Sequence, residues 1–416
     1  MIDTLHAPRL ASRRLPAGPA FYLLASIVLF FLASSSAPTP LYSVYQAEWG
    51  FSPITTTVVF GVYALAVLAG LLTVGSLSDH VGRRPVLIAA TAAQAGTMAI
   101  FVTADGVPML MAARVAQGLA TGAALGAIGA AMIDLNRTKG TVANAVAPMT
   151  GTALGGLLSG LMVQYLPAPT HFVYLALGVI FLLQTLGVVL MRETSSPRPG
   201  ALASLKIQFA LPRHVRAPFM LAIPALVASW AVAGLYGALG PTLVHLLIGR
   251  NSFVLGGLAL FVLAGSGALA VLVLRDVAAR AVAAYGATAL LVGVGVNVLA
   301  IGAGSTTWFF VSATVAGTGF GAAFQGAIRS VVPLARPHER AGVLSLLYVI
   351  SYLSMGVPAV VAGFLVVDGG GVLATAQQYG VAVMILSVLA LAGAIRRPRP
   401  VRAEVDSLDL ELADAA

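Results

Sequence analysis

The segment GSLSDHVGRRP, residues 75–85, is a short polar turn between two long apolar runs. The run before it covers residues 54–76 and the run after it covers residues 86–103, so each can cross the roughly 30 Å hydrocarbon core of a bilayer as a helix. Glycine permits the tight turn, and charged residues at a membrane face are costly unless they pair. The segment therefore predicts a hairpin of two membrane-spanning helices with a charged turn at the surface.

The same apolar character extends over the whole chain. Of its 416 residues, 59% are hydrophobic and only 9% are charged, and the mean hydropathy is +0.96. A soluble chain carries roughly 25% charged residues, so an ordinary soluble enzyme is excluded. Apolar runs of about 20 residues recur where a membrane β-barrel would alternate over about 10, which excludes a barrel. We expect an all-α polytopic membrane protein that contacts the lipid bilayer.

The net charge of +9 does not indicate a nucleic-acid partner, because the basic residues form short clusters between apolar runs, as cytoplasmic loops do. The chain has no cysteine, which excludes thiolate metal sites, thiol catalysis and disulfides. The remaining residues show no catalytic constellation, metal-ligand cluster or phosphate-binding glycine loop. We therefore expect no enzyme activity, no catalytic residue, no metal, no cofactor and no use of ATP.

The apolar runs along the chain predict twelve transmembrane helices. The longest interruption, residues 192–217, is rich in proline and basic residues and lies near the middle of the chain, so it predicts a linker between two halves. The expected segments are a cytoplasmic N-terminus 1–19, a six-helix half 20–191, a cytoplasmic linker 192–217, a six-helix half 218–395 and a cytoplasmic tail 396–416. The expected spans are 20–42, 54–76, 86–103, 108–134, 141–164, 171–191, 218–248, 252–274, 281–303, 307–332, 342–367 and 372–395.

The distribution of Lys and Arg predicts which side of the membrane each loop occupies. With a cytoplasmic N-terminus, 21 of the 23 basic residues fall in inside loops, Arg250 falls outside and Arg114 falls within a span, so both termini are expected in the cytoplasm. A cleaved signal peptide is the alternative for the first apolar run, but the many further spans favour an uncleaved helix. Scarce lysine and abundant alanine indicate a bacterial source, and hence a cell (plasma) membrane.

A weak internal repeat relates the two halves. GAALGAI begins at Gly122 in span four, and GAAFQGAI begins at Gly321 in span ten, 199 residues further along (321 − 122). Chance similarity between Ala- and Gly-rich helices is the alternative. The two segments fall in corresponding spans, however, which favours two pseudo-symmetric six-helix halves arranged as a parallel repeat.

Residues 75–85 closely resemble the signature of the major facilitator superfamily, G-x-L-[AS]-D-x-x-G-[RK]-[RK], at the loop between spans two and three. With twelve spans, the resemblance covers residues 20–395 and implies two halves that rock about a central site. It also implies a gate in which the signature aspartate meets the start of span eleven, near Ala341, and an arginine pairs with an acid at the end of span four. The residues expected in this gate are Gly75, Asp79, Gly82, Arg83, Arg84 and Asp134.

Span four begins with Arg114-Val115-Ala116-Gln117-Gly118, which resembles the R-x-x-Q-G pattern of the drug:proton antiporter branch. The resemblance implies a coupling role for Arg114, Gln117 and Gly118. An arginine at this depth either faces a cavity, held here by Gln117 or by backbone carbonyls, or extends to the outer interface by snorkelling. Arginine does not titrate at working pH, so Arg114 itself cannot carry a proton.

Two further segments concern helix packing. GTALGGLLSG, residues 151–160, is similar to the antiporter pattern G-x-x-x-G-P-x-x-G-G but has Gly156 in place of proline and Ser159 in place of glycine, which weakens the case for strict antiport. Its glycines are expected either to pack helices closely or to serve coupling, and they are Gly151, Gly155 and Gly160. Pro38-Thr39-Pro40 is expected to end span one in an extended segment, either as plain termination or as a hinge.

No Asp or Glu lies in the middle of a predicted span, although many proton-coupled relatives keep a carboxylate there. This weakens both simple proton antiport and the recognition of polycationic drugs. The uncharged polar and aromatic residues that remain either pack helices or line a cavity for a neutral amphipathic ligand. The residues expected to bind substrate are Ser35, Thr121, Trp230, Tyr236, Phe324, Gln325 and Tyr352.

Together these features predict a monomeric secondary transporter that exports a small-molecule substrate of amphipathic character by alternating access, with coupling to protons left open. A sugar or metabolite permease of the same superfamily is the alternative that the missing acid keeps open. A non-transporting receptor or scaffold is a further alternative, which the intact set of Asp79, Gly82, Arg83 and Arg84 disfavours.

Overall fold

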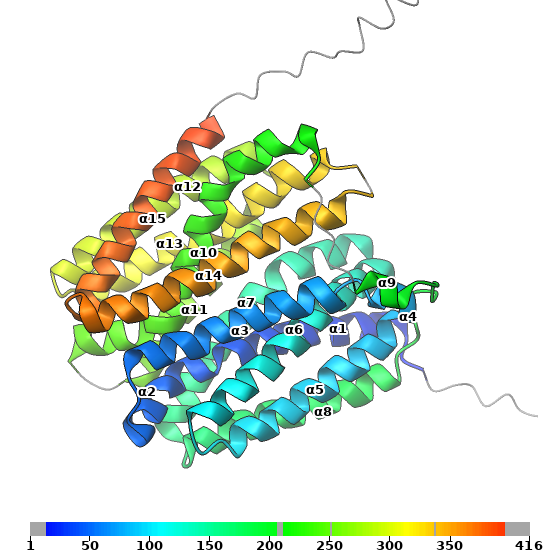
Figure 1. Cartoon of the computed structure of the whole chain (residues 1–416), viewed down its shortest axis with the longest axis horizontal. Coiled ribbons are helices and arrows are strands. Elements are labelled where there is room, and N and C mark those ends of the chain that lie inside the picture. Colours follow the sequence, from blue (N-terminus) through cyan, green and yellow to red (C-terminus); the bar gives the residue numbers. More distant parts are fainter. Residues whose placement is uncertain (1–13, 206–210, 250–251, 337, 396–416) are drawn as a thin grey trace, which may run out of the picture.

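The computed structural model describes residues 14–205, 211–249, 252–336 and 338–395, and all regular secondary structure within them is helical (Figure 1). Twelve spans are long and apolar enough to cross a membrane, so the expectation of an all-α, multi-pass membrane protein is confirmed. The helices are α1 (Ala17–Ser36), α2 (Pro38–Trp49), α3 (Pro53–Val74), α4 (Ser78–Val81), α5 (Arg83–Val102), α6 (Val107–Leu135), α7 (Arg137–Tyr165), α8 (Pro169–Val189), α9 (Ala201–Ser204), α10 (Arg213–Ile248), α11 (Phe253–Val273), α12 (Ala279–Gly302), α13 (Thr306–Val331), the 3-10 turn η1 (Val332–Leu334), α14 (Arg340–Asp368) and α15 (Gly371–Ile395).

Proline and glycine set many of the helix boundaries. Helices α2, α3, α6 and α8 carry proline in their first turn, where a backbone N–H would have no partner in the helix. Helices α2 and α10 end at Gly50 and Gly249, whose φ angles of 66° and 68° lie in the left-handed region that glycine adopts freely. These glycines are 199 residues apart (249 − 50), which is the spacing of the sequence repeat. The ends of spans one and seven therefore occupy corresponding positions.

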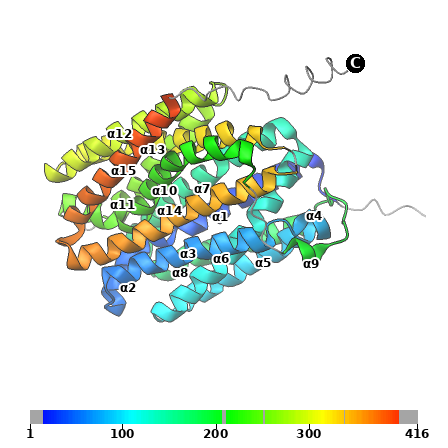
Figure 2. The ribbon, with the colours of Figure 1, turned by 45° about the horizontal axis from the view of Figure 1, so that its top comes forward.

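The spans form two groups of six. Helices α1 to α8 pack mainly against one another, and so do helices α10 to α15. The two groups meet along α3 and α14, which run side by side through the middle of Figure 1 and Figure 2. The predicted arrangement of two six-helix halves is therefore confirmed.

A second pair, α7 with α11, also lies at the interface between the halves. A Cβ added to Gly257 would lie 2.2 Å from the carbonyl oxygen of Gly156, and a Cβ added to Gly363 would lie 2.0 Å from the hydroxyl of Thr57. Side chains at these glycines would force the helices apart, so the absence of a side chain is what allows the two halves to touch.

Two ends of the bundle can be distinguished. The basic end, where α5, α7 and α10 begin, carries Arg83, Arg84, Arg137 and Arg213, with the short helices α4 and α9 beside it at the right of Figure 1. The opposite end is where α2 lies. The glycine contacts just described all lie within ten residues of helix termini at the opposite end. The halves are therefore packed tightly together there.

Some expected boundaries change. Helix α10 begins at Arg213 rather than at residue 218, and the expected linker 192–217 contains the short helix α9. Residues 1–13, Arg250 and the expected tail 396–416 lie outside the described residues.

Candidate functional site

The first span is broken at Pro38 but continues as a helix. Helix α1 ends at Ser36, Ala37 keeps helical angles (φ −56°, ψ −37°), and α2 extends from Pro38 to Trp49. The expectation that the two prolines end the span in an extended segment is therefore wrong. The physical reason is that Pro38 stands at the first position of α2. A backbone N–H at that position has no acceptor within α2, so its absence removes no hydrogen bond from that helix. The cost falls on Ser34, whose carbonyl would otherwise accept that N–H.

Two side chains of α6 donate hydrogen bonds to backbone carbonyls at this break, and one of them replaces the donor that Pro38 removes. The Gln117 side-chain amide donates to the carbonyl of Ser34 at 2.9 Å, and the Arg114 guanidinium donates to the carbonyl of Ser35 at 2.9 Å. Arg114 and Gln117 are three residues apart, so they lie on the same face of the helix. Backbone groups freed by proline in a membrane helix need such partners, because lipid offers none. Gln117 thus replaces the donor that Pro38 removes from Ser34, and Arg114 adds a second hydrogen bond beside it.

Arg114 is fully buried, with 0% of its surface exposed. Its guanidinium also donates to the side-chain oxygen of Gln117 at 2.7 Å and, from Nε, to the hydroxyl of Tyr42 at 3.0 Å. It lies 5.6 Å from the ring centre of Tyr42 and 5.0 Å from that of Tyr63, within the range of cation–π attraction. The side chain therefore does not extend to the interface by snorkelling, and in this conformation protein groups surround it.

The charge of Arg114 has no carboxylate partner inside the membrane-spanning region. All eight acidic residues among the described ranges lie in connections or at helix termini; they are Glu48, Asp79, Asp105, Asp134, Glu193, Asp276, Glu339 and Asp368. Neutral oxygens and aromatic faces are thus what hold the buried cation. The centre of the first half carries a net positive charge that arginine cannot lose at working pH.

An aromatic cluster forms on the second half around Trp230 of α10. The centre of its ring system lies 5.3 Å from that of Phe324, 5.1 Å from that of Tyr352 and 6.4 Å from that of Phe320. The indole Nε1 is buried and has no hydrogen-bond partner. Tyr63, which lies under Arg114, belongs to the same hydrophobic cluster, so the aromatic side chains connect the two halves. Three of the expected substrate-binding residues are therefore brought together.

The polar members of the expected set have mostly local partners. Ser35 donates to the carbonyl of Leu32 at 2.7 Å, and Thr121 donates to the carbonyl of Gln117 at 2.8 Å. Gln325 donates to the carbonyl of Val271 at 3.3 Å, but its side-chain oxygen is buried without a partner. Of these three, Gln325 is the one with a buried polar atom that has no hydrogen-bond partner.

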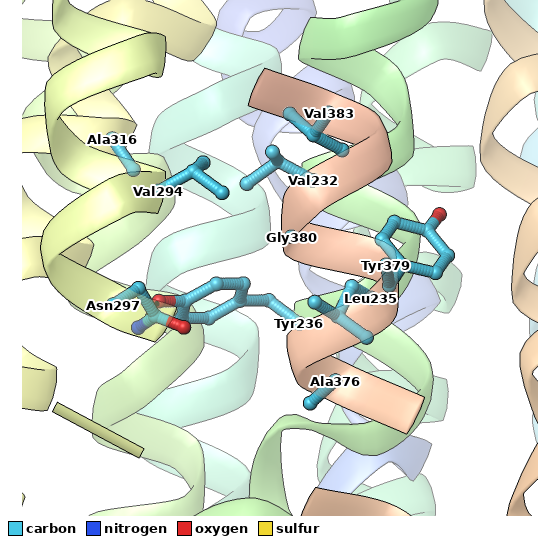
Figure 3. Close-up of a pocket in the computed structure, with 10 residues that line it drawn as sticks. All are labelled: Val232, Leu235, Tyr236, Val294, Asn297, Ala316, Ala376, Tyr379, Gly380 and Val383. Atoms are coloured by element: carbon cyan, nitrogen blue, oxygen red, sulfur yellow. Dashed lines mark hydrogen bonds between the residues drawn. The ribbon is translucent and has the colours of Figure 1, made fainter. Parts of the chain in front are cut away.

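Tyr236 lies apart from this cluster. It lines a small cavity of about 10 Å³ inside the second half, between α10, α12, α13 and α15 (Figure 3). Asn297 donates to its hydroxyl at 2.9 Å and also to Ser312 at 2.9 Å. Trp230 and Tyr236 are six residues apart, which turns them by about 120° around the helix, so they face different neighbours. Tyr236 is positioned to connect helices within its own half.

At the basic end, Arg83 brings the expected gate residues together. It pairs with Asp79 on the same turn, and its Nε lies 3.5 Å from the carboxylate of Asp134 at the end of α6. The turn depends on Gly82, whose φ of 101° favours glycine. The expected approach of Asp79 to span eleven is not the main contact in this conformation, since α4 packs chiefly on α5, α6 and α9.

Arg84 binds a helix terminus and has a counterpart in the second half. It donates to the carbonyl oxygens of Val188 and Val189 at the end of α8, and Arg280 donates to those of Ala394 and Ile395 at the end of α15. Cationic side chains are favourable where a helix leaves its last carbonyls unpaired. The corresponding contacts support the internal symmetry of the fold.

Glu193 is a residue of the basic end that the sequence reasoning did not identify. Its carboxylate accepts hydrogen bonds from the backbone N–H groups of Arg83 at 2.8 Å and Arg84 at 3.0 Å, which open α5. A carboxylate at this position satisfies free N–H groups and complements the positive end of the helix dipole. A Cβ on Gly82 would lie 2.6 Å from this carboxylate. The signature turn and the start of the linker therefore form one unit.

The glycines singled out in the sequence all sit at close approaches. A Cβ on Gly151 would lie 2.2 Å from the carbonyl oxygen of Leu29, and one on Gly155 would lie 2.1 Å from that of Ala33, both on α1. Gly160 approaches α11 instead, and Gly118 packs on α3. Gly75 likewise leaves no room for a side chain beside the last turn of α3. Helix α7 thus uses one face for its own half and another for the opposite half.

Twelve apolar spans in two six-helix halves, with a buried cation in the first half and an aromatic cluster in the second, are typical of an integral membrane protein of the transporter type. Residues 23–296 match the family model of the Major Facilitator Superfamily. The chain belongs to the Major Facilitator Superfamily, as its signature turn predicted.

One similar sequence is that of the MFS-type transporter mpsC of Macrophomina phaseolina (strain MS6), which is 31% identical over 151 residues. The match covers 35% of this chain and 29% of that protein, so the chain spans about three tenths of the relative's length.

Two solved structures share the fold at low identity. The crystal structure of the human organic anion transporter MFSD10 (TETRAN) superposes with a TM-score of 0.65 at 17% identity, covering 91% of this chain and 100% of that chain. The nucleoside transporter NupG superposes with a TM-score of 0.66 at 15% identity, covering 91% of this chain and 99% of that chain. At these identities the likeness shows the fold alone.

Proposed function

We propose that this transporter exports small neutral or anionic amphipathic molecules by alternating access, from a site where the cluster around Trp230 meets the buried Arg114. The single observation that carries the proposal is this pairing of an aromatic surface with a fixed positive charge. A flat apolar ligand can stack on these aromatic rings. An acceptor group on the ligand can accept a hydrogen bond from the unpaired indole N–H of Trp230.

The fixed charge argues against cationic cargo. At an effective dielectric constant of about 20, a unit cation held ~10 Å from the guanidinium is disfavoured by about 1.7 kcal/mol, roughly 17-fold in occupancy. An anion at that distance gains as much. A site for cations would place a carboxylate among the aromatic rings, whereas the acids of the described ranges lie in connections or at helix termini.

The packing of the two halves supports alternating access. Their glycine contacts lie toward the opposite end, and we assign the basic end to the cytoplasm because Lys and Arg prefer that side. The chain so oriented is closed to the outside. We place it as a monomer in a bacterial plasma membrane. Among the residues that the structure describes, no carboxylate lies in the middle of a span, so any proton moves with the substrate or through acids of the basic end such as Asp79 and Asp134.

The test compares accumulation of a panel of neutral, anionic and cationic fluorescent dyes in cells with and without the protein, with and without an uncoupler. We expect lower accumulation of neutral or anionic dyes. The variant Trp230→Ala should abolish the difference, whereas the matched control Trp308→Ala, which changes a side chain 58% exposed on the surface, should not. Export confined to cationic dyes would contradict the proposal.

The alternative of a sugar or metabolite permease rests on the same lack of a membrane-embedded acid. Adding radiolabelled sugars to the panel distinguishes the exporter from the permease. If cells take up a sugar through the protein and Trp230→Ala leaves that uptake unchanged, the permease is favoured.

A further inference from the structure

A second cavity lies at the opposite end, outside the cluster around Trp230 and Arg114. It has a volume of about 100 Å³ and is lined by α2 and α3 of the first half and by α10 and α15 of the second. Such a volume has room for several water molecules, or for a small organic molecule in their place. Its polar lining residues are Thr39, Tyr42, Ser43, Gln46, Thr56 and Thr242. All of them are uncharged.

Thr56 contributes an unpaired polar group to the wall of this cavity. The residue is 7% exposed, and its hydroxyl oxygen is buried without a hydrogen-bond partner. An unpaired buried hydroxyl is costly, by about 1–3 kcal/mol, unless something in the cavity pairs with it. An occupant that both donates and accepts hydrogen bonds would remove this cost.

Tyr42 adds a directed donor. Two N–H groups of Arg114 donate to its hydroxyl oxygen, so its acceptor capacity is used and its own O–H is left to donate away from the guanidinium. The positive charge behind the ring polarises that O–H and strengthens it as a donor. An occupant that reaches this O–H therefore needs an acceptor oxygen.

The remainder of the wall is apolar, with Pro53, Leu239, Pro241 and Val372 facing the same space. The wall thus combines hydroxyl and amide groups with apolar C–H surface, which suits a short polyol. Hydroxyls of such a ligand can donate to Thr56 and Gln46 and accept from Tyr42. A cation in this space would face the charge of Arg114.

We propose that this cavity is a second binding site, for a small uncharged polyol, and that its occupant stabilises the closed contact between the halves. The cavity is lined from both halves, and beside it Thr39 of the first half donates to the carbonyl of Gly237 of the second half at 3.3 Å. Separation of the halves at this end dismantles the site, so a ligand that binds here shifts the population toward the closed form. The site does not depend on what the central cluster transports.

The natural absence of cysteine makes the test direct. Single variants Ser43→Cys, at the mouth of the cavity, and Ala47→Cys, one turn further along α2 and outside the cavity, are both exposed. Alkylation of each purified variant by N-ethylmaleimide is timed in increasing glycerol. We expect glycerol to slow alkylation of Ser43→Cys relative to Ala47→Cys in a saturable manner. The ratio of the two alkylation rates should fall to half when the glycerol concentration equals the Kd of the site.

Adding Thr56→Val to the Ser43→Cys variant removes the unpaired hydroxyl at nearly constant shape. It should raise the glycerol concentration for half protection by about two- to twelve-fold, the loss expected for one neutral hydrogen bond. The matched control Thr73→Val, a partly buried threonine near the other end of the same helix, should leave that concentration unchanged. The proposal would be overturned if glycerol slowed alkylation of both cysteine variants equally, or if Thr56→Val left the half-protection concentration unchanged. Neither outcome depends on whether the protein exports dyes.

Discussion

The repair of the first span by Gln117 leads to a specific prediction about paired substitutions. In Gln117→Leu, the carbonyl of Ser34 loses its donor at 2.9 Å and the guanidinium of Arg114 loses its acceptor at 2.7 Å. Hydrogen bonds within membrane proteins contribute about 0.6 kcal/mol on average and up to about 1.7 kcal/mol. Two of them predict a loss of roughly 1–3 kcal/mol in the free energy of unfolding.

Part of that loss should be recovered by Pro38→Ala. Alanine at residue 38 returns a backbone N–H that can donate to the carbonyl of Ser34, four residues earlier, while the partner of Arg114 stays missing. The double variant should therefore be more stable than the sum of the single changes by about 0.6–1.7 kcal/mol. Pro40→Ala is the matched control, because its N–H would reach Ser36 and not Ser34.

The assay is equilibrium unfolding of the purified protein in mixed micelles titrated with a denaturing detergent, applied to the wild type, the single variants and both double variants. A coupling near zero for Gln117 with Pro38, or an equal coupling with Pro40, would refute the idea that α6 replaces the hydrogen bond that proline removes. Loss of folding in Gln117→Leu alone would shift the measurement to Gln117→Glu, whose carboxyl group keeps an acceptor for Arg114 but, when ionised, cannot donate to Ser34.

Three further predictions concern other contacts. Gly155→Ala should lower stability by about 1–3 kcal/mol in the same assay, because the added Cβ would lie 2.1 Å from a carbonyl oxygen of α1, whereas Gly96→Ala, in open space, should not destabilise; equal effects would contradict this packing. Glu193→Ala should cost about 1–2 kcal/mol by leaving the first N–H groups of α5 unpaired, and an unchanged melting temperature would count against the cap. Asp79→Asn should change stability by less than about 1 kcal/mol, since the aspartate is half exposed, yet reduce dye export; export at the wild-type rate would remove Asp79 from the gate.

The spans could be predicted from the sequence because apolar run length is a local property. Twelve apolar runs gave twelve spans, and the glycines of residues 151–160 lie where helices approach closely. Local reasoning failed at Pro38, because the donor to the carbonyl of Ser34 comes from Gln117, 83 positions after Ser34 in the chain. A rule about proline and its immediate neighbours cannot contain that information.

The candidate site was predictable in composition but not in arrangement. Burial of Arg114 followed from its depth in an apolar run, whereas its partner Tyr42 lies 72 residues away in sequence. Tyr236 was grouped with Trp230 because both are aromatic and on one span, and the helical angle between them separates them. Glu193 lies 110 residues from the backbone N–H of Arg83, and an acid in a basic linker gives no sign of such a contact.

The buried guanidinium of Arg114 also has an electrical consequence. It lies seven residues into α6, about 10 Å from the start of the helix, and so within the transmembrane voltage drop. A full elementary charge crossing the membrane changes energy by about 2.3 kcal/mol per 100 mV, so carrying Arg114 through a tenth of the field changes it by about 0.2 kcal/mol. Rocking of the first half therefore generates a small gating current even when the cargo is uncharged, and the resting potential of the cell itself biases which side is open.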